Sequence, residues 1–192
     1  MVTIMNGRKE GFNMKTFVGS DFHWGHRNIL KFNPDTRKYK DIDTMNEMMV
    51  VEWNNIASPD DVIYMLGDVS FLPPAKTVEY LSRCNGRKIL VAGNHDARSL
   101  TNEDFKKCFE EIHNYLEVTY DGNLIVMSHY PFAEWNSSHR GSVNLHGHLH
   151  GYRSGTEQYR RRDVGMDATG KILTSMEDIL ADALKGAIKK HH

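Results

Sequence analysis

The sequence has few cysteines and no long apolar run, and these shortages exclude several classes of protein. Among its 192 residues, only Cys84 and Cys108 are cysteines, too few for a disulfide framework and not spaced as a zinc knuckle. No run approaches the roughly 18 consecutive apolar residues of a membrane helix, and the N-terminal MVTIMNGRKEGFNMK lacks the apolar stretch of a signal peptide. We therefore expect a cytoplasmic protein with no membrane partner.

An excess of charge of one sign is also missing. The chain has 24 Lys and Arg against 25 Asp and Glu, a formal net charge of -1. This balance argues against a protein that mainly grips long nucleic acid, and no strong signature of nucleic-acid binding is present. The length fits one domain. Because the start-like Met14 precedes the first apolar run, we expect residues 1–13 to be an N-terminal extension and residues 14–190 a single domain. The sequence leaves the oligomeric state open.

Five short apolar runs each end abruptly at a polar residue of the kind that binds metals. They are KTFVGSDFH from Lys15, VIYMLGDV from Val62, KILVAGNHD from Lys88, NLIVMSHYP from Asn123 and VNLHGHLHG from Val143. Short β-branched runs closed by Gly or Asp are typical of buried strands. The dipeptide Asp121-Gly122, which separates YLEVTY from the fourth run, predicts a hairpin.

Helical patterns lie between these runs. Thr44 with Glu47 fits a capping box, and the apolar positions that follow at helical spacing are Met45, Met48, Met49, Trp53 and Ile56. Another helix is expected to begin at Pro73 or Pro74, and Ser175 is expected to cap one near the C-terminus. Strands that alternate with helices and then form a hairpin predict an α/β domain with a mixed sheet.

The segment VNLHGHLHGY places three histidines, His146, His148 and His150, at alternate positions. On a β-strand all three imidazoles would share one face, an arrangement that suits a cation better than a core. A solvated strand end is the alternative interpretation. His146 is left open between a structural role and a contact with substrate.

Functional sites in α/β sheets collect at the carboxyl ends of strands, so the polar residues that end the five runs are expected to converge. They are Asp21, His23, Asp68, Asn94, His129, His148 and His150. Two carboxylates, one amide and four imidazoles are more than one tetrahedral ion needs and suit two divalent first-row cations. Manganese is our first expectation, and iron, zinc, nickel or cobalt is compatible with the same ligands.

The five motifs stand in a recognisable order: D-x-H, G-D, G-N-H-D, a lone His and G-H-x-H, seen here as SDFH, LGDV, GNHD, SHYP and GHLH. With this order and spacing the chain resembles the calcineurin-like metallophosphoesterases over about residues 15–184, and looks like a small member without a cap domain. The resemblance implies a four-layer α/β/β/α fold, with a central β-sandwich of mixed sheets flanked by helices. It also implies the metal ligands: Asp21, His23 and His150 for one ion, Asn94, His129 and His148 for the other, and Asp68 as the bridge between them.

The resemblance also assigns a catalytic role to the GNHD motif. His95 would face the substrate phosphate beside the ligand Asn94, and Asp96 would accept its second N–H and orient the ring. The alternative is a sharp turn that uses Asn and Asp for their conformational freedom. His26 and Arg27, which follow the first motif, are candidates for binding the substrate phosphate, with a solvated surface position as the alternative for each.

The expected function is hydrolysis of a phosphate ester by in-line attack of a metal-bound hydroxide. Without a cap domain the cleft should be open, which favours a phosphodiesterase acting on a small or nucleotide-like substrate. A phosphomonoesterase or nucleotide pyrophosphatase is the alternative, and a non-catalytic scaffold for protein interactions is a remote one that the intact ligand set disfavours. The loop 131–142, with Trp135, His139 and Arg140, is expected to form either a wall of the cleft or an ordinary surface loop.

Overall fold

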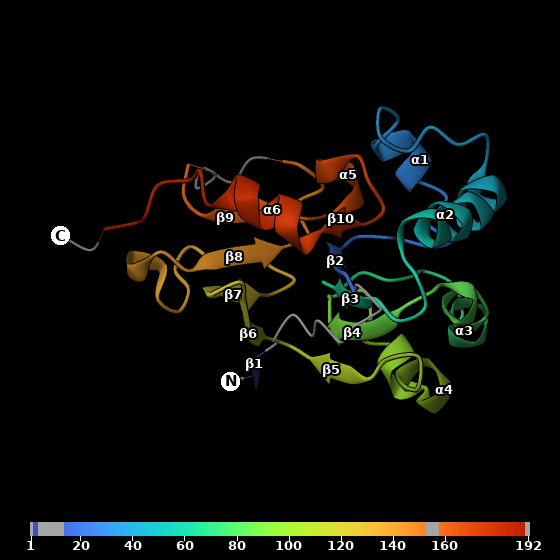
Figure 1. Cartoon of the computed structure of the whole chain (residues 1–192). Coiled ribbons are helices and arrows are strands. Elements are labelled where there is room, and N and C mark those ends of the chain that lie inside the picture. Colours follow the sequence, from blue (N-terminus) through green and yellow to red (C-terminus); the bar gives the residue numbers. More distant parts are fainter. Residues whose placement is uncertain (1, 4–13, 153–157, 191–192) are drawn as a thin grey trace.

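Two five-stranded sheets lie at the centre of the molecule (Figure 1). The computed structural model describes residues 2–3, 14–152 and 158–190. The first sheet has four parallel strands and one antiparallel edge strand, β10. In spatial order its strands are β10 (Thr174–Ser175), β2 (Thr16–Gly19), β3 (Val62–Met65), β4 (Arg87–Val91) and β5 (Glu111–His113).

The second sheet is also mixed. Its strands, in spatial order, are β1 (Val2–Thr3), β6 (Leu116–Tyr120), β7 (Asn123–Met127), β8 (Val143–His146) and β9 (Arg161–Asp163). The pair β6–β7 is antiparallel, and the other neighbours are parallel. The predicted hairpin is confirmed, because Asp121 and Gly122 connect β6 to β7 with φ values of 47° and 73°. Of the expected N-terminal extension, Val2–Thr3 form β1, and residues 4–13 lie outside the described residues.

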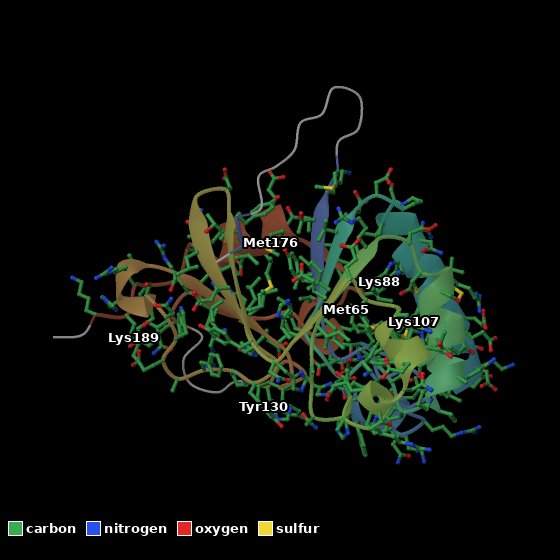
Figure 2. All side chains as sticks on the ribbon, turned by 90° about the horizontal axis from the view of Figure 1, so that it is seen from below. Met65, Lys88, Lys107, Tyr130, Met176 and Lys189 are labelled. Carbon is green, nitrogen blue, oxygen red and sulfur yellow. The ribbon has the colours of Figure 1, made fainter. Side chains whose placement is uncertain are left out.

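Alternate residues of the first sheet face two separate cores. Phe17 pairs with Ile63, and both pack against the helices that cover one face of this sheet. Val18 pairs with Tyr64, and both pack in a second core together with residues of the second sheet. Figure 2 shows Met65 and Met176 within the body of the molecule, one in each core, and Lys189 at its margin. The alternation follows from the two-residue period of a strand.

Helices flank the two sheets (Figure 1). Those on the outer face of the first sheet are α2 (Ile42–Ile56), α3 (Pro74–Arg83) and α4 (Glu103–Lys106), and α6 (Met176–Ala183) contacts β10, β2 and β9. The short elements are α1 (Ile29–Phe32), α5 (Met166–Thr169), η1 (Ser99–Thr101) and η2 (Ser138–Arg140). The expected α/β class, with mixed sheets flanked by helices, is confirmed. None of the helices in the described part of the chain has the length and apolar character needed to span a bilayer.

Of the two predicted helix caps, the one of α6 is confirmed and the one of α2 is not. Ser175 caps α6 as predicted, because its hydroxyl accepts a hydrogen bond from the N–H of Asp178 at 3.0 Å. The prediction that Thr44 caps α2 is wrong. This helix begins at Ile42, and the carboxylate of Asp41 accepts the N–H of Thr44 at 2.8 Å. Thr44 therefore lies in the first turn of the helix. Its backbone N–H is one of the groups that an N-cap side chain must satisfy, so Thr44 is not itself the cap.

The predicted apolar stripe of α2 is narrower than expected. Met45, Met49 and Trp53 are fully buried, whereas Met48 is 40% exposed and Ile56 is 38% exposed. Residues four apart share one face of a helix, and Met48 falls beside that row rather than in it.

Met48 and Met49 provide a matched pair for testing this core. We expect Met49→Ala to lower the free energy of unfolding by about 2–5 kcal/mol, because it opens a cavity in a packed core. Met48→Ala, on the exposed side, should change it by less than about 0.5 kcal/mol. Urea unfolding followed by circular dichroism measures both changes. Equal losses of unfolding free energy in the two variants would show that Met49 is no more part of the core than Met48.

Candidate metal centre

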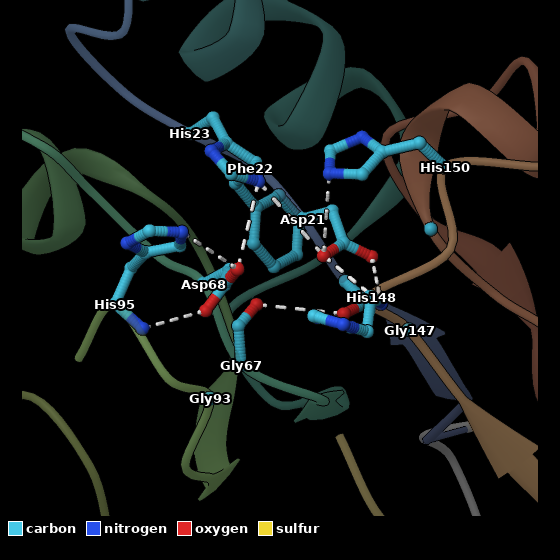
Figure 3. A network of polar contacts seen from close by, with 12 residues as sticks. Asp21, Phe22, His23, Gly67, Asp68, Gly93, His95, Gly147, His148 and His150 are labelled. Carbon is cyan, nitrogen blue, oxygen red and sulfur yellow. Dashed lines mark hydrogen bonds and ion pairs between the residues drawn. The ribbon is translucent and has the colours of Figure 1, made fainter. Parts of the chain in front are cut away.

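The loops that leave β2, β3, β4, β7 and β8 meet at one end of the two sheets. Figure 3 shows residues of four of these loops, among them Asp21, Asp68, His95 and His148. This end is the carboxyl end of the five strands, as the sequence predicted. The loops bring together all seven expected ligands, which are Asp21, His23, Asp68, Asn94, His129, His148 and His150.

The first group consists of Asp21, His23 and His150, whose potential ligand atoms lie within 4.8 Å of one another. Oδ1 of the fully buried Asp21 is 3.9 Å from Nε2 of His23 and 4.0 Å from Nε2 of His150. Oδ2 accepts the backbone N–H of His148 at 2.9 Å, which ties the loop after β8 to the loop after β2. One carboxylate and two imidazoles form a donor set that suits a divalent first-row cation.

The second group consists of Asp68, His129 and His148, again with potential ligand atoms within 4.8 Å of one another. Asn94 belongs beside it, since its Oδ1 is 3.0 Å from Nε2 of His129. The other ring nitrogen of His129, Nδ1, donates to the carbonyl of Leu66 at 2.7 Å. Because a carbonyl can only accept, Nδ1 carries a hydrogen, and Nε2, the atom that faces the group, is the ring nitrogen free to bind a metal when the ring is neutral.

Asp68 lies between the two groups. Its Oδ1 is 3.4 Å from Nε2 of His129 in the second group, and its Oδ2 is 3.8 Å from Nε2 of His23 in the first. The backbone N–H of His95 also donates to Oδ1 at 2.9 Å. Burial alone would raise the pKa of Asp68, but the hydrogen bond and charge of His129 outweigh it and hold the pKa at about 2. The carboxylate is thus anionic over the whole physiological range.

Five of the expected ligands have left-handed backbone. Asp21, His23, Asp68, His148 and His150 have φ values of 56°, 55°, 53°, 71° and 50° and make up five of the seven non-glycine residues with positive φ in the described part of the chain. This conformation costs a residue with a side chain of order 1–3 kcal/mol and persists where the surrounding structure enforces it. Such strain clusters at functional sites, so its concentration here marks the loops as shaped for ligand positions rather than for stability.

Two glycines allow the loops to approach one another. A Cβ atom at Gly147 would lie 2.6 Å from Oδ2 of Asp21, and one at Gly93 would lie 2.5 Å from the backbone nitrogen of Asp68. Both distances are shorter than any packing contact. The glycines of GHLH and GNHD therefore allow the backbone of each motif to lie directly against the turns that carry Asp21 and Asp68.

His23 tests whether these residues fit a metal. The residue is 3% exposed, and neither of its ring nitrogens has a hydrogen-bond partner among the described residues. A buried polar group without a partner is costly, yet Nε2 faces the carboxylates of Asp21 and Asp68 at 3.9 Å and 3.8 Å. A cation coordinated by these three side chains would give Nε2 of His23 a partner. The donor set fits divalent metal ions.

Behind the first group, Arg37 and Asp167 hold the ligand loops, and neither residue was among the predicted site residues. The buried guanidinium of Arg37 donates to the backbone carbonyls of Asp21 at 2.6 Å and Phe22 at 3.1 Å and forms an ion pair with Asp167 at 2.7 Å. Asp167 in turn accepts Nδ1–H of His150 at 2.7 Å, which turns Nε2 of that ring toward Asp21. Burial would lower the pKa of His150, but the carboxylate of Asp167 outweighs it and raises the pKa.

The prediction that Asp96 accepts a hydrogen bond from the ring of His95 is wrong. Asp96 is 1% exposed, and its carboxylate accepts the backbone N–H groups of Gly93, Asp68 and Val69 at 2.8, 3.0 and 2.9 Å rather than the His95 ring. It therefore joins the GNHD turn to the GDV turn. The His95 side chain is 44% exposed, with Nε2 3.9 Å from Oδ2 of Asp68. His95 thus faces the open side of the centre.

Of the two candidates for binding the substrate phosphate, His26 lies beside the metal centre and Arg27 does not. The ring of His26 stacks on Phe71 with centroids 4.2 Å apart and lies 5.4 Å from the ring of His23. Burial and the neighbouring imidazoles lower the pKa of His26 to about 4. The ring is therefore neutral at pH 7, so His26 can offer a phosphate only a neutral N–H. Arg27 is exposed and does not line the two hollows beside the centre.

The idea that three histidines share one strand face is wrong. β8 ends at His146, and His148 and His150 lie in the left-handed turn that follows. His146 is 2% exposed, with Nδ1 2.8 Å from the carbonyl of Gly147. In the loop 131–142, Trp135 is buried and donates to the carbonyl of Ser142 at 3.2 Å. It packs under this loop rather than forming a wall of the cleft.

Two hollows flank the two groups. One, of about 360 Å³, is lined by His23 and His150 of the first group together with His26, Phe32 and Tyr152. The other, of about 410 Å³, is lined by Asn94 and His129 together with Leu100, Tyr130 and Phe132. The candidate metal centre is thus open on two sides.

Comparison with known proteins identifies the family. A model of the family described as calcineurin-like phosphoesterase matches residues 14–191. The chain belongs to this family. Its members are phosphoesterases that depend on divalent metal ions, so the protein is a hydrolase acting on phosphate esters.

Several proteins are similar to this calcineurin-like phosphoesterase over most of its length. It is 30% identical to the uncharacterized protein MJ1445 of Methanocaldococcus jannaschii over 138 residues, 71% of this chain and 69% of that protein. It is 25% identical to the Gene 66 protein of Mycobacterium phage L5 over 191 residues, 84% and 91% of the two chains. Among solved structures, the protein of unknown function AQ665 from Aquifex aeolicus is similar, with a TM-score of 0.69, 26% identity and coverage of 87% and 98%.

Asp167 offers a test of the first ligand group. Asp167→Asn keeps the size of the side chain but removes the charge that faces Arg37 and orients His150. We expect cation affinity at the first group to fall by about 10- to 100-fold, with the second group little changed. Calorimetric titration of Mn²⁺ into chelator-treated protein measures both, and Asp182→Asn, which removes a half-exposed carboxylate paired with Arg162, is the control. Unchanged binding at both sites would show that Asp167 has no part in positioning His150.

Proposed function

We propose that this phosphoesterase works with two divalent cations, manganese being the first candidate, and that Asp68 bridges them. The observation that carries the proposal is the position of Asp68, whose two oxygens face His129 and His23 in different ligand groups. In this proposal Asp21, His23 and His150 hold one ion, and Asn94, His129 and His148 hold the other. When bound, such a pair supplies Lewis acidity and lowers the pKa of a coordinated water.

We also propose that the substrate is a phosphodiester. The two ligand groups lie between two open hollows, and a diester carries one substituent on each side of its phosphorus. A monoester would occupy one hollow only. The volumes, about 360 and 410 Å³, suit small, nucleotide-like substituents rather than macromolecular ones.

In this mechanism the residues around the metal centre hold Asp68 and His95 in position, and His95 supplies one proton. Asp96 holds the turns that carry Asp68 and His95, because it accepts backbone N–H groups from both sides of Asp68. The ring of Phe71 lies 4.5 Å from that of His95 and limits its movement. From this position Nε2 of His95 would donate a proton or hydrogen bond to a phosphate oxygen that gains negative charge.

The choice of ester tests the proposed substrate class. With Mn²⁺ present, we expect kcat/KM for bis-p-nitrophenyl phosphate to exceed that for p-nitrophenyl phosphate by at least about tenfold, since only the diester fills both hollows. Asp68→Asn should abolish hydrolysis of both. A preference for the monoester would overturn the diester proposal, and full activity of Asp68→Asn would remove the bridge.

His95 separates catalysis from metal binding. His95→Ala should lower kcat by about 10²- to 10⁴-fold while both cations stay bound, because general acid–base groups contribute in this range. If Nε2 protonates the leaving oxygen, the loss should be large for a methyl leaving group and small for nitrophenolate. Stopped-flow kinetics measures kcat for the two esters, and elemental analysis of the same preparation measures the bound metal. Wild-type kcat for both esters, with metals retained, would exclude His95 from the mechanism.

A further inference from the structure

One hollow beside the candidate metal centre has exposed aromatic rings at its rim. It has a volume of about 360 Å³ and extends from the buried His23 to Phe32, at the end of α1, and Tyr152, in the loop after β8. We call it the Phe32–Tyr152 cleft. Phe32 is 64% exposed and Tyr152 is 73% exposed, more than the other large apolar residues of the described chain. Exposed rings at the mouth of a cleft are a costly surface that a bound ligand would cover.

Two rings that line this cleft, Phe32 and His26, are connected through Phe71 to His95, which also lines it. His26 meets the edge of Phe32 at a centroid distance of 6.0 Å and stacks on Phe71 at 4.2 Å. Phe71 in turn lies 4.5 Å from His95, which faces Asp68. These contacts hold His26 and Phe71 in place before any ligand arrives. A flat group attached to the phosphate would therefore meet preorganised ring surfaces.

The lining of the cleft selects for an uncharged occupant. Among the described residues that line it, none is Asp, Glu, Lys or Arg. The polar groups are imidazoles, the amide of Asn33 and the hydroxyl of Tyr152. Apart from the proposed cation at His23 and His150, a charged substituent would find no counter-ion among these residues. A planar, uncharged group with hydrogen-bonding edges matches both the rings and the amide, and a nucleobase is such a group.

The second hollow has a different character. Small and aliphatic residues, among them Ala92, Ala97 and Leu100, form much of its lining. Its most exposed ring, Tyr130, already packs against His148 with centroids 4.5 Å apart. This hollow therefore offers less free ring surface for stacking than the Phe32–Tyr152 cleft does.

We propose that the Phe32–Tyr152 cleft binds the nucleobase of a nucleoside phosphate ester, and that Phe32 and Tyr152 select it by stacking. The proposal rests on the phosphodiester function proposed above and names its substrate class. Stacking of one base on an aromatic side chain strengthens binding by about 5- to 150-fold. The near-neutral chain favours a single nucleoside over a long polynucleotide.

Two ligands that differ by the base alone test the cleft. Adenosine 5′-monophosphate and ribose 5-phosphate are titrated separately into the Mn²⁺-loaded protein by calorimetry. We expect the nucleotide to bind at least about tenfold more tightly, because the ribose phosphate lacks the ring. Equal affinities, or no binding of the nucleotide, would overturn the proposal.

Variants locate the base. Phe32→Ala and Tyr152→Ala should each reduce the ratio of the two affinities by about fivefold or more and leave the affinity for ribose 5-phosphate unchanged. Phe32→Leu keeps an apolar side chain without the ring and should reduce the ratio as well. Phe132→Ala, in the second hollow, is the matched control and should leave it unchanged. If only Phe132→Ala lowers the ratio of the two affinities, the base binds in the second hollow and the proposal is refuted.

Hydrolysis of bis-p-nitrophenyl phosphate by the same preparations separates this inference from the proposed function. Hydrolysis without any preference for the nucleotide would refute the base site and leave the phosphodiesterase standing. A preference for the nucleotide without hydrolysis would support the base site and refute the phosphodiesterase.

Discussion

The buried carboxylate of Asp68 is the group on which the rest of the site depends. One oxygen faces His129, which follows a strand of the second sheet, and the other faces His23, which follows a strand of the first. The same carboxylate accepts the backbone N–H of His95, so three loops are positioned around one anion. The stacking of two sheets with their carboxyl ends at a common edge is what allows loops from both to reach it. The architecture thus brings imidazoles from both sheets to this anion.

That arrangement is unfavourable in isolation, and the surrounding structure supports it. Five ligands adopt left-handed backbone, and the two central carboxylates are almost fully buried. Asp96 offsets part of this cost with three hydrogen bonds to backbone N–H groups. Arg37 does the same on the other side, where its guanidinium holds two backbone carbonyls and the carboxylate of Asp167. Divalent cations would offset more, because one would provide the partner that Nε2 of His23 lacks. We infer that metal binding and the stability of this end of the molecule are coupled.

The sequence predicted the strands well because each ends where an apolar run meets a polar, metal-binding residue, and this signal is local. The hairpin at Asp121-Gly122 and the cap at Ser175 were predicted for the same reason. The shared strand face of the GHLH histidines was a wrong prediction, because the change of backbone after His146 depends on contact with Asp21 from a distant loop. Arg37 carries no local signal, since its partners are backbone carbonyls and a residue 130 positions away. Asp167 was detectable in principle, because it follows the short strand β9 as the other site residues follow theirs.

In the proposed centre, Asp68 joins two cations. Crystals of the protein soaked with Mn²⁺ test it most directly, by anomalous diffraction measured near the manganese absorption edge. If Asp68 bridges two cations, two peaks about 3.5–4 Å apart are expected on either side of its carboxylate, one against His23 and His150 and the other against His129 and His148. A single peak, or two peaks that Asp68 does not join, would contradict it.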